Sequence, residues 1–393
     1  MSAASVLFKH AKQLRGGKRF SQFVRECREE KKLDFADVKI GELAHLAYGD
    51  DVGGGLSRDS RRQAWVQEAT EATDATAFRD VISSMSTASL EDGYKQAASG
   101  VVPLFGVFET PNQPEGEHQH FFKANSTGQV QAVAPGTEYP RAGQLGYKVA
   151  VPEPSKFGLI AALTIETVKS NQTRQFLKDQ LDVGRAVGAH QVKAFLRCMF
   201  GITNTYKRNG TLFNTYQIGG AWTNGIDDFD ITRGPGEFDR GNQMFDRMLH
   251  PVTNEPIPVM PDTVLGVGAQ IFQVKSIVRA TEIRVTAGAT TTIGANPLID
   301  QNPTLLTDKF IRPMLLGDGG LTAIQADTNM LFGQMNEAFM NRQIEPFKVF
   351  ETNEAQIGYP DFFQDIVYAA KGRWWGVPFV MDPMKVLRLR KMA

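Results

Sequence analysis

The most constraining feature of the sequence is a helical stretch from Thr173 to about Phe200 that contains no proline. Its apolar and glycine residues recur at steps of three and four, on one face of an α-helix. These residues are Leu177, Leu181, Gly184, Gly188, Val192, Phe195 and Met199. The helix would extend for roughly 40 Å. Each glycine destabilises the helix by about 1 kcal/mol relative to alanine. The close approach of another backbone would explain why glycine stands at 184 and 188, so we expect such a contact there.

Residues 101–155 differ in character from this helix. They are polar, rich in glycine and proline, and alternate like strands over 129–133 and 147–151. A long two-stranded hairpin is only marginally stable by itself. We therefore expect an extended hairpin that packs against another subunit or another domain.

The remaining chain predicts an α+β fold. A strand over 157–164 leads into the long helix, and a later helix over 267–280 carries Ile271, Val274 and Val278 on one face. Strand-like segments follow, without the regular strand–helix alternation of a doubly wound enzyme. They cover 281–300, 304–315, 322–334 and much of 347–393. We expect mixed, mostly antiparallel pairing.

The first 32 residues are basic, with nine Lys or Arg against three Glu and hence a net charge of +6. Two interpretations remain open. The segment is either a solvated helix or arm that docks on its own or a neighbouring chain, or a basic arm that contacts nucleic acid. The candidate DNA-facing residues are Lys12, Arg15, Lys18 and Arg19.

The composition excludes several classes of protein. Lys and Arg number 43, as do Asp and Glu, which argues against a chain whose main task is to coat nucleic acid. A neutral chain also tends to associate. Two cysteines cannot supply a disulfide framework or a four-cysteine zinc site. The sequence has neither a secretory signal pattern nor a long apolar run, so we expect a soluble protein made in the cytoplasm.

Motifs for catalysis are absent from the sequence: it has no phosphate-binding G-x-x-x-x-G-K-[ST], no G-x-S-x-G and no H-E-x-x-H. His118 and His120 could place two imidazoles near a metal ion, but they lack a recognisable third ligand. Asp227, Asp228 and Asp230 lack the spacing and the closing Glu of a calcium loop. We therefore expect no enzyme, no cofactor and no metal site.

The order of these elements resembles the major capsid proteins of tailed bacteriophages, which have the Hong Kong 97-type fold. Within that class the chain is most similar to the Mu-type major head subunit family, over about 100–393. Six short motifs carry the resemblance through their order and spacing. They are APGTEY at 134–139, GLI at 158–160, LTIETV at 163–168, TRQ at 173–175, GRA at 184–186 and GANPL at 294–298.

The resemblance implies a division of the chain. Residues 1–100 would form an N-terminal arm and 101–155 an extended loop that overlaps the neighbouring subunit. A peripheral domain would comprise 156–254 and 351–393, with a spine helix at 173–200, and 255–350 would form an axial domain. The inter-subunit contacts would include Glu138, Tyr139, Gly184 and Gly188.

The same resemblance implies a structural function. The chain would assemble into hexamers and pentamers of an icosahedral head that encloses double-stranded DNA through non-specific contacts. Its partners would be further copies of itself together with scaffolding, portal and decoration proteins. The resemblance implies no contact with a membrane. The mature location would be the virion, after assembly in the cytoplasm of a host bacterium.

Two other functions stay open at this point. One is the shell of an encapsulin-like nanocompartment, which encloses an enzyme in place of DNA. The other is a metal-dependent enzyme that uses His118 and His120.

Overall fold

The structure is a computed structural model that describes part of the chain. The described residues are 73–98, 100–108, 117–123, 146–164, 166–167, 170, 172–219, 222–234, 236–250, 256–280, 282–287, 290–295, 303–352 and 366–391, together with Leu7, Val38, Lys39 and Leu43. They belong to two compact units. The first draws on Met1–Ala98, Lys156–Gln191 and Glu345–Trp374, and the second on Ser99–Ser155, Val192–Ile344 and Trp375–Ala393.

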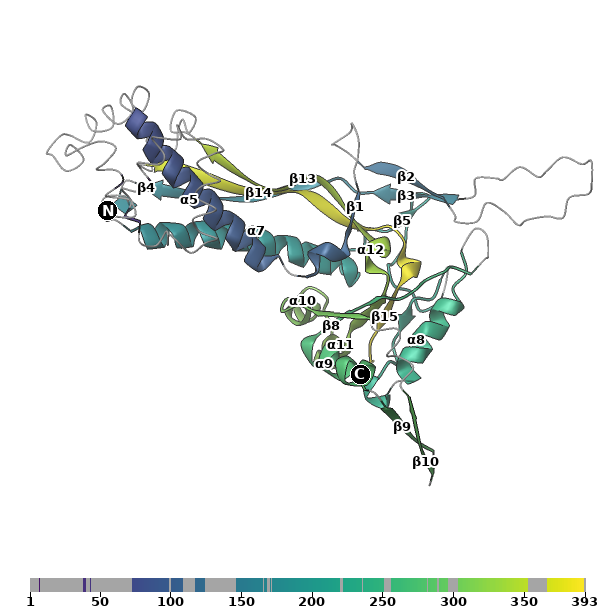
Figure 1. The fold of residues 1–393 in the computed structure, drawn as a ribbon. Helices are drawn as coiled ribbons and strands as arrows, with labels where there is room; N and C mark the ends of the chain where they lie inside the picture. The colour runs from purple at the N-terminus through teal and green to yellow at the C-terminus, as the bar shows by residue number, and fades with distance from the viewer. Residues whose placement is uncertain are drawn as a thin grey trace, which may run out of the picture. The chain divides into compact units, whose positions relative to one another are not determined.

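Two long helices dominate the first unit: α5 (Thr73–Ala97) and α7 (Thr173–Met199), which continues into the second unit (Figure 1). α7 confirms the long helix predicted from the absence of proline. Its buried face includes Phe176 and Val187, which are 1% and 3% exposed. Of the face predicted from the sequence, Val192, Phe195 and Met199 are fully buried, whereas Leu177 and Leu181 are only half-buried.

A four-stranded sheet has the order β1-β13-β14-β4. Its strands are β1 (Gly106–Phe108), β13 (Phe339–Thr352), β14 (Ile366–Val380) and β4 (Ser155–Thr164), and β4 confirms the strand predicted over 157–164. Within the first unit, Phe157 of β4 stacks on the fully buried Trp374 of β14, with ring centroids 5.7 Å apart. It also lies 4.3 Å from the ring of His190 on α7, so the helix packs on this sheet.

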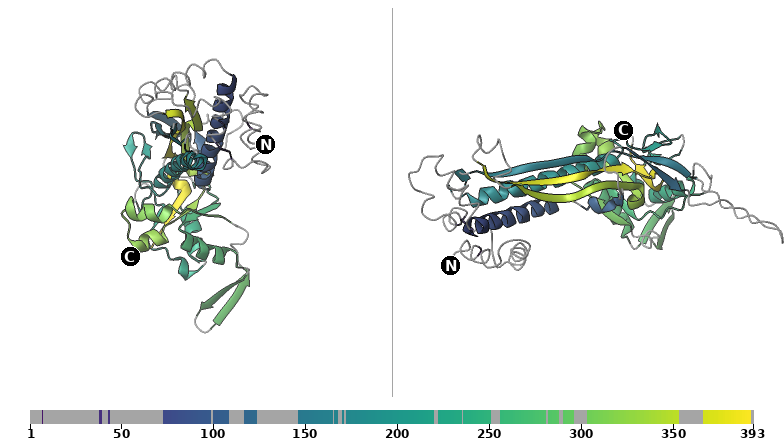
Figure 2. Two further views of the ribbon diagram at one scale, coloured as in Figure 1. Left: turned by 90° about the vertical axis from the view of Figure 1, so that its left-hand side faces the viewer. Right: turned by 90° about the horizontal axis from the view of Figure 1, so that it is seen from above.

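Glycines let α5 and α7 cross with their backbones in contact (Figure 2). A Cβ added at Gly184 would overlap the carbonyl oxygen of Leu90, and one at Gly93 would overlap that of Leu181. A Cβ at Gly188 would lie 3.0 Å from the carbonyl oxygen of Tyr94. The close approach expected at Gly184 and Gly188 is therefore present, but the approaching backbone belongs to α5 of the same chain and not to a second subunit.

The region predicted as an N-terminal arm, over 1–100, contains a long helix in its described part. Residues 73–97 form α5, which is integrated into the first unit. Met85 and Leu90 are fully buried, and the ring of Tyr94 stacks on that of Phe347 at 4.2 Å. The hydroxyl of Thr87 donates to Glu351 at 2.7 Å. Sequence reasoning missed this docking because the described buried face of the helix is broad and includes Ser86 and Ser89, so the sequence shows no narrow apolar stripe.

The second unit is built on a five-stranded sheet with the order β11-β8-β12-β15-β7. The strands are β11 (Thr304–Thr307), β8 (Thr263–Gly266), β12 (Met330–Gly333), β15 (Val386–Leu389) and β7 (Gly225–Ile226). Every residue of β8 and β12 is buried, as expected for short apolar runs covered on both faces. Antiparallel pairs outnumber parallel ones among the registers that the structure describes, which confirms the predicted mixed pairing.

Helices cover this sheet. The rings of Phe238 and Phe245 on α8 (Gly236–Asp246) each lie 5.8 Å from that of Phe332 on β12. α9 (Gly268–Val278) confirms the helix predicted over 267–280 and buries the expected face, Ile271, Val274 and Val278.

Two predicted strands, over 304–315 and 322–334, are only partly right. β11 and β12 are present, but α10 (Ile311–Gly317) and α11 (Ala323–Thr328) replace the rest. A capping box starts α11, because Thr322 accepts from the backbone of Gln325 while the Gln325 side chain accepts from that of Thr322. Arg312 of α10 also pairs with Asp327 of α11, at 2.5 Å. A helix of one or two turns gives too short a pattern to distinguish from a strand.

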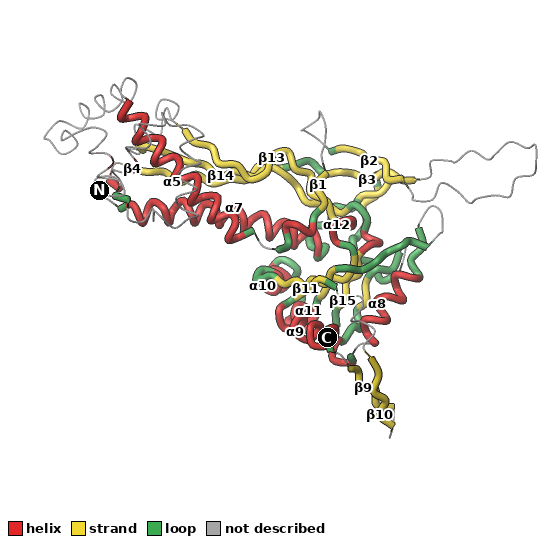
Figure 3. Tube along the Cα trace, in the orientation of Figure 1, coloured by secondary structure: helices red, strands yellow, loops and turns green. Residues whose placement is uncertain are grey.

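Further short elements complete the second unit. β2 (His118–Lys123) and β3 (Gly146–Val151) pair antiparallel and continue through β5 (Lys207–Arg208) to β6 (Thr211–Leu212). β9 (Glu282–Ala287) and β10 (Thr290–Ala295) form a separate two-stranded ribbon, which confirms the strands predicted there (Figure 3). The short helices are α12 (Met335–Ala338), η3 (Val102–Leu104), η4 (Ile231–Arg233) and η7 (Pro383–Lys385).

The compact units divide the chain differently from the predicted domains. The prediction separates 156–254 and 351–393 from 255–350. In the structure β7 and β15, from the first group, hydrogen-bond in one sheet with β8, β11 and β12 from the second. Sheet pairing therefore joins β7 and β15 to strands of 255–350 within the second unit.

Replacing Gly184 with alanine tests the contact between α5 and α7. Helix propensity alone predicts a gain of about 1 kcal/mol. Because the new Cβ would overlap a carbonyl oxygen, we expect instead a loss of about 1–3 kcal/mol in the free energy of unfolding, measured by chemical denaturation.

Gly317→Ala is the matched control. Gly317 ends α10, and a Cβ there meets no atom within 4 Å. This variant should be neutral or slightly stabilised. A Gly184→Ala protein as stable as Gly317→Ala would contradict the backbone contact.

Candidate assembly interfaces

Most of the predicted contact residues lie outside the described part of the chain. Glu138 and Tyr139 of the extended loop are among them, as are the basic residues Lys12, Arg15, Lys18 and Arg19. Gly184 and Gly188 are described, and α5 covers them. The structure does describe the base of the predicted hairpin, and the candidate interface is built from there.

The two strands of the hairpin base are paired throughout, from His118 opposite Val151 to Lys123 opposite Gly146. Val149 and Val151 of β3 are fully buried. The side chain of Asn209 accepts from the backbone N–H of Lys148 at 2.9 Å, and the Asn209 N–H donates to the Lys148 carbonyl at 2.8 Å. These hydrogen bonds therefore fix the described base of the hairpin within the second unit.

A buried arginine holds the end of β3. Arg342 is fully buried, and its Nη1 donates to the carbonyl oxygen of Pro152 at 2.9 Å. Burial lowers the pKa of Arg342, and the nearby charge of Glu153 opposes that shift. Near the other strand, Lys207 of β5 pairs with Glu117 at 2.7 Å.

Aromatic rings enclose Arg208 of β5 at the same base. Its guanidinium carbon lies 5.7 Å from the ring centroid of Tyr147, 5.0 Å from that of Phe213 and 5.5 Å from that of Trp222. We call these three rings the Arg208 box. Tyr206, fully buried, packs edge-on against Trp222 at 5.6 Å. Cation–π contacts of this kind are strongest where water is excluded, so the box fastens β3 to β5.

Sequence reasoning missed the Arg208 box. The one local signal was the dipeptide Asn209-Gly210, which is typical of a tight hairpin turn. Both residues have positive φ, 49° and 83°, as such a turn requires. The rings of the box come from separate segments, and no spacing in the sequence brings them together.

β4 is a second candidate interface because it is an edge strand. In the part of the chain that the structure describes, β14 is the strand that pairs with it, and none pairs with its other edge. Its consecutive residues Leu159 and Ile160 are 48% and 65% exposed, one on each face of the sheet. Exposed edge strands are sites at which other chains add, and isolated proteins usually protect them.

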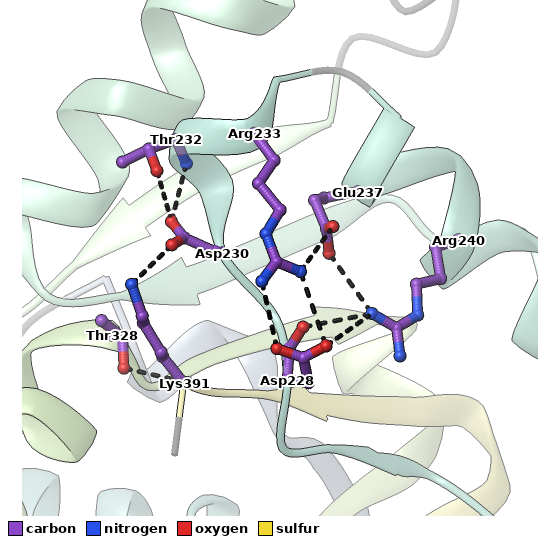
Figure 4. Close-up of polar contacts among 8 residues, drawn as sticks. All are labelled: Asp228, Asp230, Thr232, Arg233, Glu237, Arg240, Thr328 and Lys391. Atoms are coloured by element: carbon purple, nitrogen blue, oxygen red, sulfur yellow. Dashed lines mark hydrogen bonds and ion pairs between the residues drawn. The ribbon is translucent and has the colours of Figure 1, made fainter. Parts of the chain in front are cut away.

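The acidic residues at 227–230 form ion pairs, and Figure 4 shows those of Asp228 and Asp230. Arg390 makes two bonds to the carboxylate of Asp227, at 2.6 and 2.8 Å, and these bonds lower the pKa of Asp227. Lys391 lies 2.6 Å from Asp230 and, together with Thr232, lowers the pKa of Asp230 to about 2.

The third carboxylate, Asp228, is exposed and lies 3.3 Å from Arg233 and 3.9 Å from Arg240. Each member of the cluster therefore already has a basic partner. The network ties the segment before η4 to the end of the described chain beyond β15, and structural support is its evident role.

The two histidines considered for a metal site belong to β2. The ring of His120 lies edge-on to that of Phe108, 5.2 Å away. Among the described residues, no three His, Cys, Asp or Glu side chains gather as a metal site would require. No helix of that same part of the chain is long and apolar enough to cross a bilayer.

Comparison with known proteins gives likeness in structure alone. No protein-family model matches the chain, and no curated protein is similar to it in sequence. Similar solved structures include "Mycobacterium phage Ogopogo", at 13% identity, TM-score 0.42, and coverage of 75% of this chain and 92% of that chain. The "Capsid structure of the Cyanophage P-SCSP1u" has 10% identity, TM-score 0.43, and coverage of 74% and 86%.

A third similar structure is the "virus-like particle from Pyrococcus furiosus", at 7% identity, TM-score 0.39, and coverage of 78% of this chain and 97% of that chain. At such identities and scores the likeness does not assign a family, and the function is inferred below from the chain itself.

Replacing Arg208 with alanine tests the hairpin base. The substitution removes a partly buried cation from three rings together with its packed stem, so we expect a loss of about 2–3 kcal/mol in the free energy of unfolding. Arg233→Ala is the control, because its guanidinium is 51% exposed and exposed ion pairs contribute about 1 kcal/mol or less. Equal losses in the two variants would contradict a special role for the Arg208 box.

Proposed function

We propose that this chain is the major structural subunit of a closed icosahedral shell that encloses double-stranded DNA. The observation that carries this proposal is the anchored hairpin base. Because Lys123 pairs with Gly146, the two ends of the connection 124–145 lie side by side. Hairpin connections usually have two to five residues, and connections longer than about 15 residues are uncommon and usually functional.

The composition of this long connection indicates what it does. Residues 124–145 are polar and contain glycine and proline, so they cannot form a core of their own. A rigid base would hold such a segment in place for contact with a neighbouring molecule. The segment also carries Glu138 and Tyr139, which we propose as contacts with a second copy of the chain.

Two further features support a self-associating chain. The exposed edge of β4 offers backbone donors and acceptors beside Leu159 and Ile160. Zero formal net charge limits the repulsion between many identical copies packed on every side. A closed shell needs several such interfaces on each subunit.

The parts of the subunit would then have distinct roles. We assign the overlap between neighbours to 101–155, the spine of a peripheral domain to α7, and the approach to capsomer centres to 255–350. Because α5 covers Gly184 and Gly188, this proposal gives them no inter-subunit contact. Lys12, Arg15, Lys18 and Arg19 would face DNA and contact its phosphates without reading its sequence.

The proposed partners follow from this function. They are copies of the chain in hexamers and pentamers, scaffolding, portal and decoration proteins during assembly, and the packaged DNA. The location would be the virion, after assembly in a bacterial cytoplasm. The proposal involves no catalytic step and no cofactor.

Assembly is the direct expectation. The full chain, expressed alone or with its scaffolding protein, should form closed shells visible by negative-stain electron microscopy. Persistent monomers under both conditions would contradict the proposal. The contents of purified particles, DNA or an enclosed enzyme, would separate a viral head from a nanocompartment.

The register of the hairpin permits a sharper test. Replacing residues 124–145 by Asn-Gly would leave Lys123 and Gly146 joined by a two-residue turn of the favoured kind. We expect a folded protein, with a change of about 1 kcal/mol or less in the free energy of unfolding, that no longer assembles. If this variant forms shells as well as the unaltered chain does, residues 124–145 are not an assembly contact.

A further inference from the structure

One edge of β4 is open in the part of the chain that the structure describes. The strand (Ser155–Thr164) pairs with β14 on its other side. At its centre, Leu159 and Ile160 are 48% and 65% exposed, and consecutive residues of a strand point to opposite faces of the sheet. Gly158 and Ala162 are exposed as well. The centre of β4 is therefore accessible along its edge and on both faces.

The sequence of β4 lacks the features that keep an edge strand apart from other chains. Residues 157–164 include no charged residue and no proline. Proteins that work as monomers usually place a charge or a proline at such an edge, because its free backbone donors and acceptors attract further strands. A short, uncharged segment without proline is also the pattern that pairs strand to strand between chains. These properties predict that another chain completes the sheet at β4.

The strand is complementary to a second copy of itself. In an antiparallel pair centred on Ile160, this side chain faces its own counterpart. Leu159 then faces Ala161, and Gly158 faces Ala162. Apolar and β-branched side chains that face each other stabilise a sheet. This register therefore covers both of the exposed large side chains, on the two faces of the strand.

The charges at the ends of β4 fit the same register. Lys156 faces Thr164 of the second copy, and Glu166 follows two positions later. Diagonal neighbours at this offset are within reach of a long side chain. Lys156 and Glu166 are both exposed in the single chain. The pairing therefore brings opposite charges together at both ends of the strand and sets no like charges face to face.

We propose that β4 pairs antiparallel with β4 of a second copy of this chain, about a two-fold axis beside Ile160. The sheets of the two copies then form one continuous sheet across the contact. Such a contact is isologous, because both copies use the same surface. The inference deepens the proposed function, on which it rests, because it names the partner of the β4 interface and the register of the contact.

A disulfide across the axis tests this register. Particles of the full-length Ile160→Cys variant, treated with oxidised glutathione, should contain a disulfide-linked dimer. Facing residues of antiparallel strands have Cα atoms about 4.5–5.5 Å apart, which suits a disulfide. Lys156→Cys is the matched control on the same strand. Its two copies would lie about eight positions apart along the strands, or roughly 26 Å, and should not link.

The outcomes separate the pairing from the shell. The unaltered protein, oxidised in the same way, gives the background from Cys27 and Cys198. If the Ile160→Cys variant gives no dimer above that background, the pairing is overturned, and shells that form nevertheless leave the proposed function standing. A linked dimer without shells would support the pairing and contradict the proposed function. Equal linkage in Ile160→Cys and Lys156→Cys would also overturn the proposal.

Charges at the axis give a second test that needs no disulfide. Ile160→Lys and Ile160→Glu each set like charges face to face, so each variant alone should assemble less than the unaltered chain. Because Ile160 is 65% exposed, neither change disturbs the packed interior. A one-to-one mixture sets opposite charges face to face and should yield at least about twofold more particles than either variant, measured by light scattering. Equal yields from the mixture and the separate variants would overturn the proposal, because a contact of Ile160 with any other segment gains nothing from mixing.

Discussion

The attachment of the β2–β3 hairpin to the second unit is the constraint on which the rest of the account depends. Three different interactions hold it. Arg342 bonds to the residue that follows β3, Asn209 bonds to both backbone groups of Lys148, and Arg208 contacts the ring of Tyr147 within the Arg208 box. None of these would be needed for a loop that moves freely in solvent. A base fixed in this way gives the long connection a defined origin, which a repeating contact between identical subunits requires.

The first unit shows a related use of close contact. α5 and α7 cross at glycines, which brings two backbones together and leaves no room for side chains between them. Such a crossing is sensitive to a single added methyl group, whereas an interface of large apolar side chains can rearrange. The sheet beside α7 leaves one edge of β4 open among the described strands. The unit thus combines a tightly packed interior with an unprotected edge.

Long elements with a clear period could be predicted from the sequence. α7 follows from the lack of proline and the spacing of its apolar residues, and the buried face of α9 was predicted residue by residue. The short helices α10 and α11 were not, because one or two turns give no distinct period. The glycines at 184 and 188 predicted that another backbone approaches this helix closely, but their spacing could not identify that backbone as α5.

Features that depend on distant residues could not be predicted. The partners of Asp227 and Asp230 are Arg390 and Lys391, more than 160 positions away. Charge counting identified the acidic cluster correctly as a group without calcium-loop spacing, but only the fold shows that cations already neutralise it.

The central claim is that residues 124–145 are buried between copies of this chain. The most direct measurement is hydrogen exchange of peptides from that segment in assembled particles and in dissociated subunits at the same pH. The account predicts strong protection of the segment in particles and rapid exchange in subunits, with β12 equally protected in both. Equal, rapid exchange of 124–145 in the two states would contradict it.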